Sequence, residues 1–338
     1  MIRVPRPDFT HLISLSGPHG TFEHADHALP RVEHGYCTDD VARVLLVTSR
    51  ESEPPVELRQ LATSSLDFLR RAQSTDGRFK NRRSPSGAWL GVATDDDCWG
   101  RAVWALGTVI ARSTDATLIE GATDLFDRSS GVVSPSLRAM AFATFGAAEV
   151  LAGDPTNEGA LALVAAAAAL LDRPERIKGW HWCEDRLAYA NAALPEAMMV
   201  AGALSGSDRL VENGLRQLEW LLDMSSLKGH LSVTPAEGRS PRVAAAKFDQ
   251  QPIEVAAISE ACLRATALTG DLEWIRGHEL AVQWFLGEND VGTLMFCAET
   301  GGGYDGLTAT GPNLNQGAES TIALLTTLQR ASQLELAP

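Results

Sequence analysis

Residues 95–107 read DDDCWGRAVWALG, and the architecture follows from this short run. It opens on three acidic residues and continues into a stretch, Ala102 to Gly107, that is small or apolar on most sides. A helix that is apolar on most sides is buried all round, whereas a helix with one polar face lies at the surface. The run therefore predicts a buried helix from Asp97 to Arg112 that begins among acidic side chains.

Polar or acidic openings of this kind recur along the chain at intervals of 40 to 65 residues. The openings are Thr38-Asp39-Asp40, Asp95-Asp96-Asp97, Ser134-Pro135-Ser136, Leu194-Pro195-Glu196, Gln251-Pro252-Ile253-Glu254 and Gly317-Ala318-Glu319. Between them lie amphipathic stretches, such as residues 56–71 and 209–222, each with one polar face. Each interval is long enough for a buried inner helix, an amphipathic outer helix and a loop, so the pattern predicts a divergent helical-hairpin repeat.

Helix-type periodicity dominates and strand signals are nearly absent, so we expect an all-α protein. The expected helices cover residues 38–50, 55–73, 97–112, 116–127, 135–151, 157–171, 195–204, 208–224, 251–268, 272–287 and 316–334. Six hairpins that close into an (α/α)6 toroid, or barrel, bury one continuous core without a linker. We therefore expect a single domain over residues 1–338, with residues 1–33 as an irregular N-terminal segment packed on the ring. A superhelical stack of helix pairs is the alternative.

Charge and hydropathy exclude several kinds of partner. The chain has 338 residues and a formal net charge of −14, so it repels polyanions and we expect no nucleic-acid partner. Its longest apolar run, residues 160–171, spans 12 residues, well short of the roughly 20 that cross a bilayer, so we expect no membrane association. Residues 1–7 lack the apolar core of a secretory signal. We expect a cytoplasmic protein whose five cysteines are reduced.

Four motifs carry a resemblance to a known group of proteins. They are EHGYCTDDVAR at 33–43, DDCWGRA at 96–102, DQQPIE at 249–254 and NQGAES at 315–320. The chain resembles the six-hairpin glycosidase-like superfamily, and within it a bacterial group of α/α-toroid proteins often labelled as glycosyltransferases or found beside them. The resemblance implies a ring whose inner-helix N-termini surround a carbohydrate-binding cleft, an oligosaccharide or glycoside as substrate, and a functional association with a glycosyltransferase.

Parallel inner helices bring their acidic openings to one mouth of the ring. Glycoside hydrolysis needs one protonated carboxyl and one carboxylate, and crowding raises the pKa of one member of a close pair. We expect Asp40 and Asp97 to be the acid and base, and Glu254 and Glu319 to be second carboxylates or to bind hydroxyl groups. The candidate catalytic set is Asp39, Asp40, Asp96, Asp97, Glu254 and Glu319. The competing interpretation is that these acids cap their helices, although one residue suffices for a cap.

Aromatic and polar residues near the same openings suit a sugar, because C–H faces of sugar rings stack on aromatic planes. The candidate substrate-binding set is His34, Tyr36, Trp99, Arg43, Arg101, Trp182, Gln251, Tyr304 and Gln316. Packing in the core is the alternative for the aromatic residues, and Arg43 and Arg101 are spaced to order the acids by ion pairing. The run Gly301–Gly306 matches a dinucleotide fingerprint, but no βαβ unit surrounds it, so we interpret it as a flexible loop that could close over the site.

The function that these residues favour is carbohydrate-active, and we expect a glycoside hydrolase without a cofactor. One alternative is a sugar isomerase or epimerase on the same ring, which would use histidine as base and acid. Another is a non-catalytic saccharide-binding partner of a glycosyltransferase. A third is a zinc-dependent toroid enzyme similar to the lanthionine cyclases, with ligands from Cys37, Cys98, His181 and Cys183.

Overall fold

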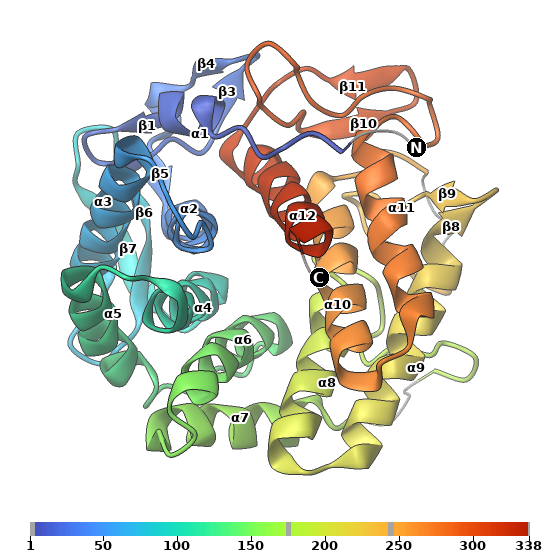
Figure 1. Ribbon diagram of the computed structural model, residues 1–338, viewed down its shortest axis with the longest axis horizontal. Helices are drawn as coiled ribbons and strands as arrows, with labels where there is room; N and C mark the ends of the chain where they lie inside the picture. Colours follow the sequence, from blue (N-terminus) through green and yellow to red (C-terminus); the bar gives the residue numbers. More distant parts are fainter. Residues whose placement is uncertain (1–3, 174–176, 243–246, 337–338) are drawn as a thin grey trace.

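The computed structural model describes residues 4–173, 177–242 and 247–336, and within them six helices stand side by side in an inner ring (Figure 1). Each inner helix contacts the next one along the chain, and the last contacts the first, so the ring is closed. The inner helices are α2 (Thr38–Ser49), α4 (Asp97–Arg112), α6 (Leu137–Gly153), α8 (Ala193–Ser205), α10 (Pro252–Thr269) and α12 (Ala318–Leu336).

Five helices lie outside this ring, each packed on the inner helix that precedes it (Figure 1). They are α3 (Val56–Ala72), α5 (Ala116–Ser129), α7 (Glu158–Leu171), α9 (Asp208–Ser225) and α11 (Ile275–Phe285). All of them except the apolar α7 are amphipathic. The short helix α1 (Thr10–Ser14) contacts α12 and α3 and so takes the sixth outer position. The predicted all-α toroid of six hairpins is confirmed, and the described part of the N-terminal segment packs on the ring; residues 1–3 lie outside the described residues.

All the expected helices occur, with ends within three residues of the expected ones. Short strands complete the loops: β1 (Ser16–Gly17), β2 (Gly20–Thr21), β3 (Ala25–Asp26), β4 (Leu29–Pro30), β5 (Tyr36–Cys37), β6 (Phe79–Arg83), β7 (Trp89–Thr94), β8 (Ser226–Leu227), β9 (His230–Leu231), β10 (Gly306–Thr308) and β11 (Gly311–Asn313). The antiparallel sheet β5-β6-β7 leads directly into α2 and α4, while the other strands form two-stranded hairpins. Two 3-10 turns, Val32–His34 and Leu272–Trp274, precede β5 and α11.

Small residues let α4 and α6 approach closely. A Cβ atom added at Gly107 would lie 2.2 Å from the carbonyl oxygen of Gly146, and one added at Gly100 would lie 2.2 Å from that of Ala139. Ala102 and Leu106, on the same helix, are completely buried. The run that opened the sequence analysis is therefore small and apolar because both of its sides face other helices.

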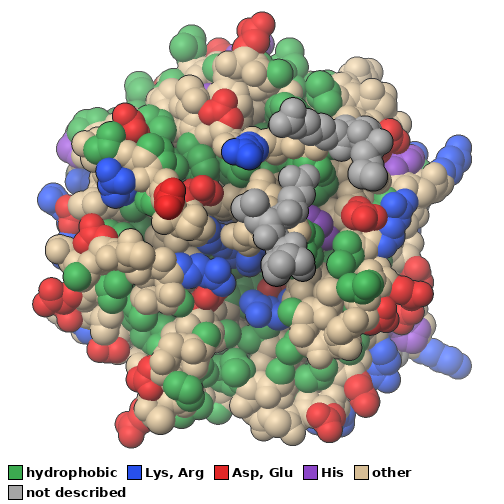
Figure 2. Space-filling view, viewed as in Figure 1, with side chains coloured by type: hydrophobic (Ala, Val, Ile, Leu, Met, Phe, Trp, Pro, Cys, Tyr) green, Lys and Arg blue, Asp and Glu red, His purple; other side chains and the backbone are tan. Residues whose placement is uncertain are grey.

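The two ends of the ring differ. At the C-terminal ends of α2 and α12 a cavity of about 740 Å³ is lined by polar and cationic side chains, among them Arg6, Arg50, Arg112 and Gln329. Figure 2 shows one face of the molecule, hollowed near its centre, where Lys and Arg side chains gather. Beneath this end Glu260 pairs with Arg50 and Arg330 at 2.7 Å each. None of the described helices is long and apolar enough to span a membrane.

Candidate active site

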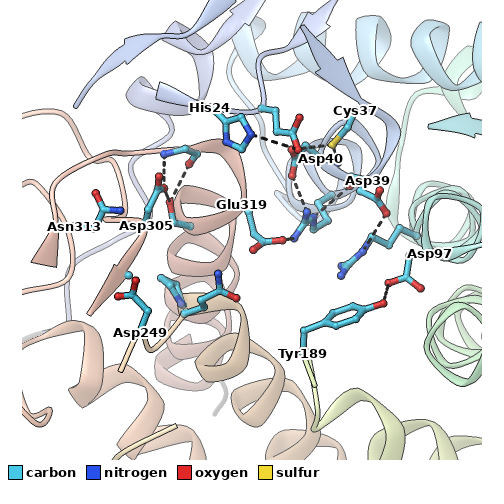
Figure 3. Close-up of a pocket in the computed structure, with 18 of the residues that line it drawn as sticks. His24, Cys37, Asp39, Asp40, Asp97, Tyr189, Asp249, Asp305, Asn313 and Glu319 are labelled. Carbon is cyan, nitrogen blue, oxygen red and sulfur yellow. Dashed lines mark hydrogen bonds and ion pairs between the residues drawn. The ribbon is translucent and has the colours of Figure 1, made fainter. Parts of the chain in front are cut away.

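The N-terminal ends of the inner helices surround a cavity of about 460 Å³ (Figure 3). Its lining comes from α2, α4, α12, the residues just before α8 and α10, and the loops around residues 23 and 305. The lining residues are Glu23, His24, Cys37, Asp39, Asp40, Arg43, Arg82, Asp97, Arg101, Tyr189, Asp249, Gln251, Pro252, Asp305, Gly306, Asn313, Gly317, Glu319 and Ser320. The size lies within the range of about 300–1,000 Å³ that holds small ligands.

Four of the six candidate carboxylates line this cavity: Asp39, Asp40, Asp97 and Glu319. So do three of the candidate binding residues, Arg43, Arg101 and Gln251. The mouth of a ring thus collects side chains that are up to 280 positions apart in the chain, from residue 39 to residue 319. Parallel inner helices produce this convergence, since each contributes its first turn to the same end.

Two candidate carboxylates do not line the cavity. Asp96 precedes the first turn of α4 and is exposed. Glu254 is 4% exposed and accepts hydrogen bonds from the backbone and side chain of Asn191, at 3.2 and 2.8 Å. Neither side chain caps its helix, and α2 is capped by Cys37, whose sulfur accepts from the amide of Asp40 at 3.4 Å. Helix capping therefore does not account for the acidic residues at these three helix starts.

Asp40 is engaged in a buried ion-pair chain. Arg43 donates to Asp40 and to Glu319, at 2.7 Å each, and the thiol of Cys37 donates to the other Asp40 oxygen at 3.0 Å. Burial raises the pKa of Asp40 to about 6 although Arg43 opposes the shift. Burial also acts to raise the pKa of Glu319, but Arg43 and Arg101 outweigh it and the net shift is downward. Asp40 lines the cavity but is only 2% exposed, and both of its oxygens accept hydrogen bonds, so it holds Arg43 in position.

Asp97 forms a pair with a residue that sequence patterns do not single out. The hydroxyl of Tyr189 donates to Asp97 at 2.5 Å. Burial raises the pKa of Asp97, against the influence of Arg101 and of the Tyr189 hydrogen bond. A carboxyl whose pKa is raised by burial keeps its proton nearer to neutral pH, as a general acid must. Tyr189 lies in the loop before α8, at no helix start, so helix-opening motifs could not have found it.

A network behind Tyr189 holds it in place. Arg138 donates to the carbonyl of Tyr189 at 2.6 Å and lies 4.7 Å from the centre of its ring. Arg138 also donates to the side chain of Asn191 at 3.2 Å, and Asn191 in turn donates to Glu254. Between them Ala190 adopts a positive φ of 44°, an uncommon conformation for a residue with a Cβ. Glu254 thus supports the loop that presents Tyr189 to the cavity.

Replacing Glu254 with glutamine is expected to make stability less dependent on pH. Burial raises the pKa of Glu254 to about 7, so ionisation opposes folding and the opposition grows as pH rises from about 4.5 to 7. Relative to Glu254→Gln, the wild-type protein should lose up to about 3 kcal/mol of unfolding free energy over that range. Urea unfolding of both proteins between pH 5 and 8 measures the difference. Glu120→Gln, at an exposed position on α5, is the control: its unfolding free energy should differ from that of the wild-type protein by the same amount at every pH. A difference for Glu254→Gln that is likewise independent of pH would contradict the expectation.

Asp249 and Asp305 line the cavity and were not among the candidates. Asp249 is exposed, and its side chain has no hydrogen-bond or ion-pair partner among the described residues. Asp305 accepts from the amide of Gly317 and the hydroxyl of Ser320, at 2.7 Å each, and so holds the first turn of α12. In Figure 3 these two carboxylates lie on one side of the cavity, Asp97 and Tyr189 on the other, and Glu319 between them. Asp249 stands just before the Gln251-Pro252 opening, a signal that the sequence did offer.

Most of the candidate binding residues outside the helix starts lie away from the cavity lining. Trp99 and Trp182 are completely buried, and Tyr36, 2% exposed, stacks on Phe22 with ring centres 4.6 Å apart. The remaining three are His34, which is exposed, Tyr304, which is half-buried, and Gln316, which is buried. The aromatic residues fill gaps between helices, where their large apolar area stabilises the fold.

The described residues do not bring together the ligands of the alternative zinc site. The described residues contain one group of three possible metal ligands whose ligand atoms all lie within 4.8 Å of one another: Glu23, Cys37 and Asp40. This group does not include Cys98, His181 or Cys183. Burial raises the pKa of the Cys37 thiol well above its ordinary value, and the nearby Asp40 adds to the shift. Zinc binds the thiolate, so this environment disfavours it.

Comparison with solved structures identifies the fold. No protein-family model and no curated protein matches the sequence. A sugar epimerase from a ruminal bacterium is 13% identical, with a TM-score of 0.73 and 95% of each chain covered. A cellobiose 2-epimerase from Bacillus thermoamylovorans is 13% identical, with a TM-score of 0.70 and the same coverage. A cellulase of C. cellulolyticium in complex with cellobiose is 8% identical, with a TM-score of 0.64 and coverage of 94% of this chain and 88% of that one. The chain therefore shares the (α/α)6 toroid fold of these structures.

Proposed function

We propose that this protein is a glycoside hydrolase that acts on a short oligosaccharide in the cavity at the N-terminal ends of the inner helices. One observation carries the proposal: two carboxyl groups lie on opposite sides of this cavity, Asp97, whose pKa is raised by burial, and Asp249, whose side chain has no hydrogen-bond or ion-pair partner among the described residues. That is the pair of groups that glycosidic hydrolysis needs. Proteins with this fold that act on sugars support the proposal.

Four of the lining residues act directly in the proposed reaction. Asp97 in its acid form donates its proton to the glycosidic oxygen as the bond to the anomeric carbon breaks. Asp249 takes a proton from the water that attacks that carbon, or attacks the carbon itself if the reaction proceeds in two steps. Arg43, held by Asp40, and Glu319 offer a donor and an acceptor to sugar hydroxyl groups.

A panel of oligosaccharides tests the proposal. The purified protein is incubated with α- and β-linked disaccharides, and the products are followed by chromatography and by NMR of the anomeric proton. Release of monosaccharides supports hydrolysis, and the first anomer formed tells whether Asp249 acts as base or as nucleophile. Quantitative recovery of every intact disaccharide would remove the proposal.

Tyr189→Phe is expected to move the alkaline limb of kcat/KM to higher pH. The Tyr189 hydrogen bond favours the ionised form of Asp97, so its loss raises the pKa of Asp97 further and the acid form persists to higher pH. Loss of one hydrogen bond to a charged group should also lower kcat about tenfold. Tyr304→Phe, outside the cavity lining, is the control. An alkaline limb that stays in place in Tyr189→Phe would contradict the assigned pairing.

A sugar epimerase or isomerase is the second candidate, because the sugar epimerase and the D-mannose isomerase match this chain over almost their whole lengths. Among the described cavity-lining residues His24 is the one histidine, so proton transfer at carbon would depend on carboxylates or Tyr189. Products isomeric with the substrate, rather than hydrolysed, distinguish this reaction. Association with a glycosyltransferase and a cytoplasmic location stay predictions.

A further inference from the structure

A smaller apolar chamber lies directly inward of the proposed active site. It has a volume of about 60 Å³, and Arg43, Arg101 and Glu319 line both it and the larger cavity. A cavity needs about 10–15 Å³ to hold one water molecule, so the chamber has room for a group of only a few atoms. The two spaces are thus separated by three side chains of the site itself.

These three side chains form the roof of the chamber. The guanidinium of Arg101 lies 4.1 Å from the centre of the Phe142 ring, and Arg43 is bonded to Glu319 at 2.7 Å. The side chain of Glu319 is 43% exposed. Because Glu319 lines both spaces, a small group on a sugar bound beside Glu319 would lie next to the chamber.

The walls are apolar and leave space because they are built from small residues. Trp104 and Phe145 pack edge to face at 4.9 Å between ring centres and form one wall. Opposite them α8 and α10 contribute alanines, among them Ala257, which is only half-buried although it faces the interior of the ring. The lining surface is almost entirely apolar.

Two carboxyl groups also line the chamber, and each lies beside an arginine. Glu260 accepts from Arg50 and Arg330, and Glu196 lies 3.6 Å from Arg264. A hydroxyl group placed in the chamber would lose its hydration and find few free partners, which costs free energy. A methyl group would gain by leaving water.

We propose that the chamber receives a methyl substituent of the sugar, so that the substrate is a methyl-bearing sugar such as a 6-deoxyhexose or an O-methyl hexose. This inference rests on the proposed function, because it requires a sugar ring in the larger cavity. One methyl group in an apolar pocket is worth about 10–200-fold in discrimination.

Matched sugar pairs test the inference by binding rather than by turnover. Titration calorimetry with the wild-type protein compares D-fucose with D-galactose, D-quinovose with D-glucose, L-rhamnose with L-mannose, and 3-O-methyl-D-glucose with D-glucose. In at least one pair the methyl-bearing sugar should bind ten or more times more tightly than its hydroxyl counterpart. Equal affinities within every pair would overturn the inference and leave hydrolysis standing. Absence of binding by all these sugars would also overturn the inference, whereas the proposed function stands or falls on the disaccharide panel.

A variant that fills the chamber tests whether the preference for the methyl-bearing sugar arises there. Ala257→Leu places three extra carbon atoms in the chamber, and the ratio of affinities within the responsive pair should then fall to near one. Ala166→Leu makes the same change at a half-buried position of the outer helix α7 and should keep the wild-type ratio. A wild-type ratio in Ala257→Leu would show that the methyl group binds elsewhere.

Discussion

Replacing Asp97 with asparagine is expected to lower kcat for glycoside hydrolysis by about 10²–10⁴-fold. Asparagine has the same shape and still accepts the hydrogen bond from Tyr189, but it has no proton to give to the leaving oxygen. The urea midpoint should change little, because the side chain is half-buried and lines the cavity rather than the apolar core. Initial rates and unfolding curves for the two proteins, measured in the same buffer, check both statements.

The neighbouring residue provides a matched control. Asp96→Asn makes the same chemical change one position earlier, at a side chain that is exposed, makes no capping hydrogen bond and lies outside the cavity lining. Its kcat should stay within about twofold of wild type, as for a surface change away from the site. If kcat fell equally in Asp96→Asn and Asp97→Asn, Asp97 would act only through its negative charge at this end of the ring. Full activity in Asp97→Asn would show that Asp97 has no part in the mechanism.

The ring could be predicted from the sequence because its cause is local and repeated. Stretches such as 102–107 are apolar on most sides and stretches such as 209–222 are amphipathic, so burial alone sorts the helices into inner and outer sets. Once the inner helices are parallel, the convergence of Asp39, Asp97 and Glu319 follows from topology.

The remainder of the site depends on contacts that no periodic pattern records. Tyr189 reaches Asp97 through a loop that is held by Arg138 and Glu254, partners on other parts of the chain. Conversely, Trp99 and Trp182 lie beside polar openings in the sequence but are completely buried. An aromatic residue near a helix start serves packing and ligand binding equally well in sequence terms, and only the direction of its side chain distinguishes the two.

The end of the ring away from the proposed active site is held by charge rather than by apolar packing. Glu260 accepts hydrogen bonds from Arg50 at 2.7 and 3.3 Å and from Arg330 at 2.9 and 2.7 Å, so both oxygens are fully engaged. These residues come from α10, from α12 and from the end of α2, and the cluster therefore joins three inner helices. Burial opposes ionisation of Glu260, but the two arginines outweigh it and lower its pKa.

Glu260→Ala is therefore expected to lower the free energy of unfolding by about 3–5 kcal/mol, since it leaves two largely buried guanidinium groups without their counter-charge. Because the pKa of Glu260 is lower in the folded state, its contribution is complete above the unfolded pKa and is lost as pH falls below about 4.5. Urea unfolding at pH 7 and at pH 4 should thus show a larger difference between wild type and variant at pH 7. Glu279→Ala, which breaks the exposed pair with Arg276, should cost less than about 1 kcal/mol at either pH. A loss in Glu260→Ala no larger than that of this control would mean that the three helices are held together without the ion cluster.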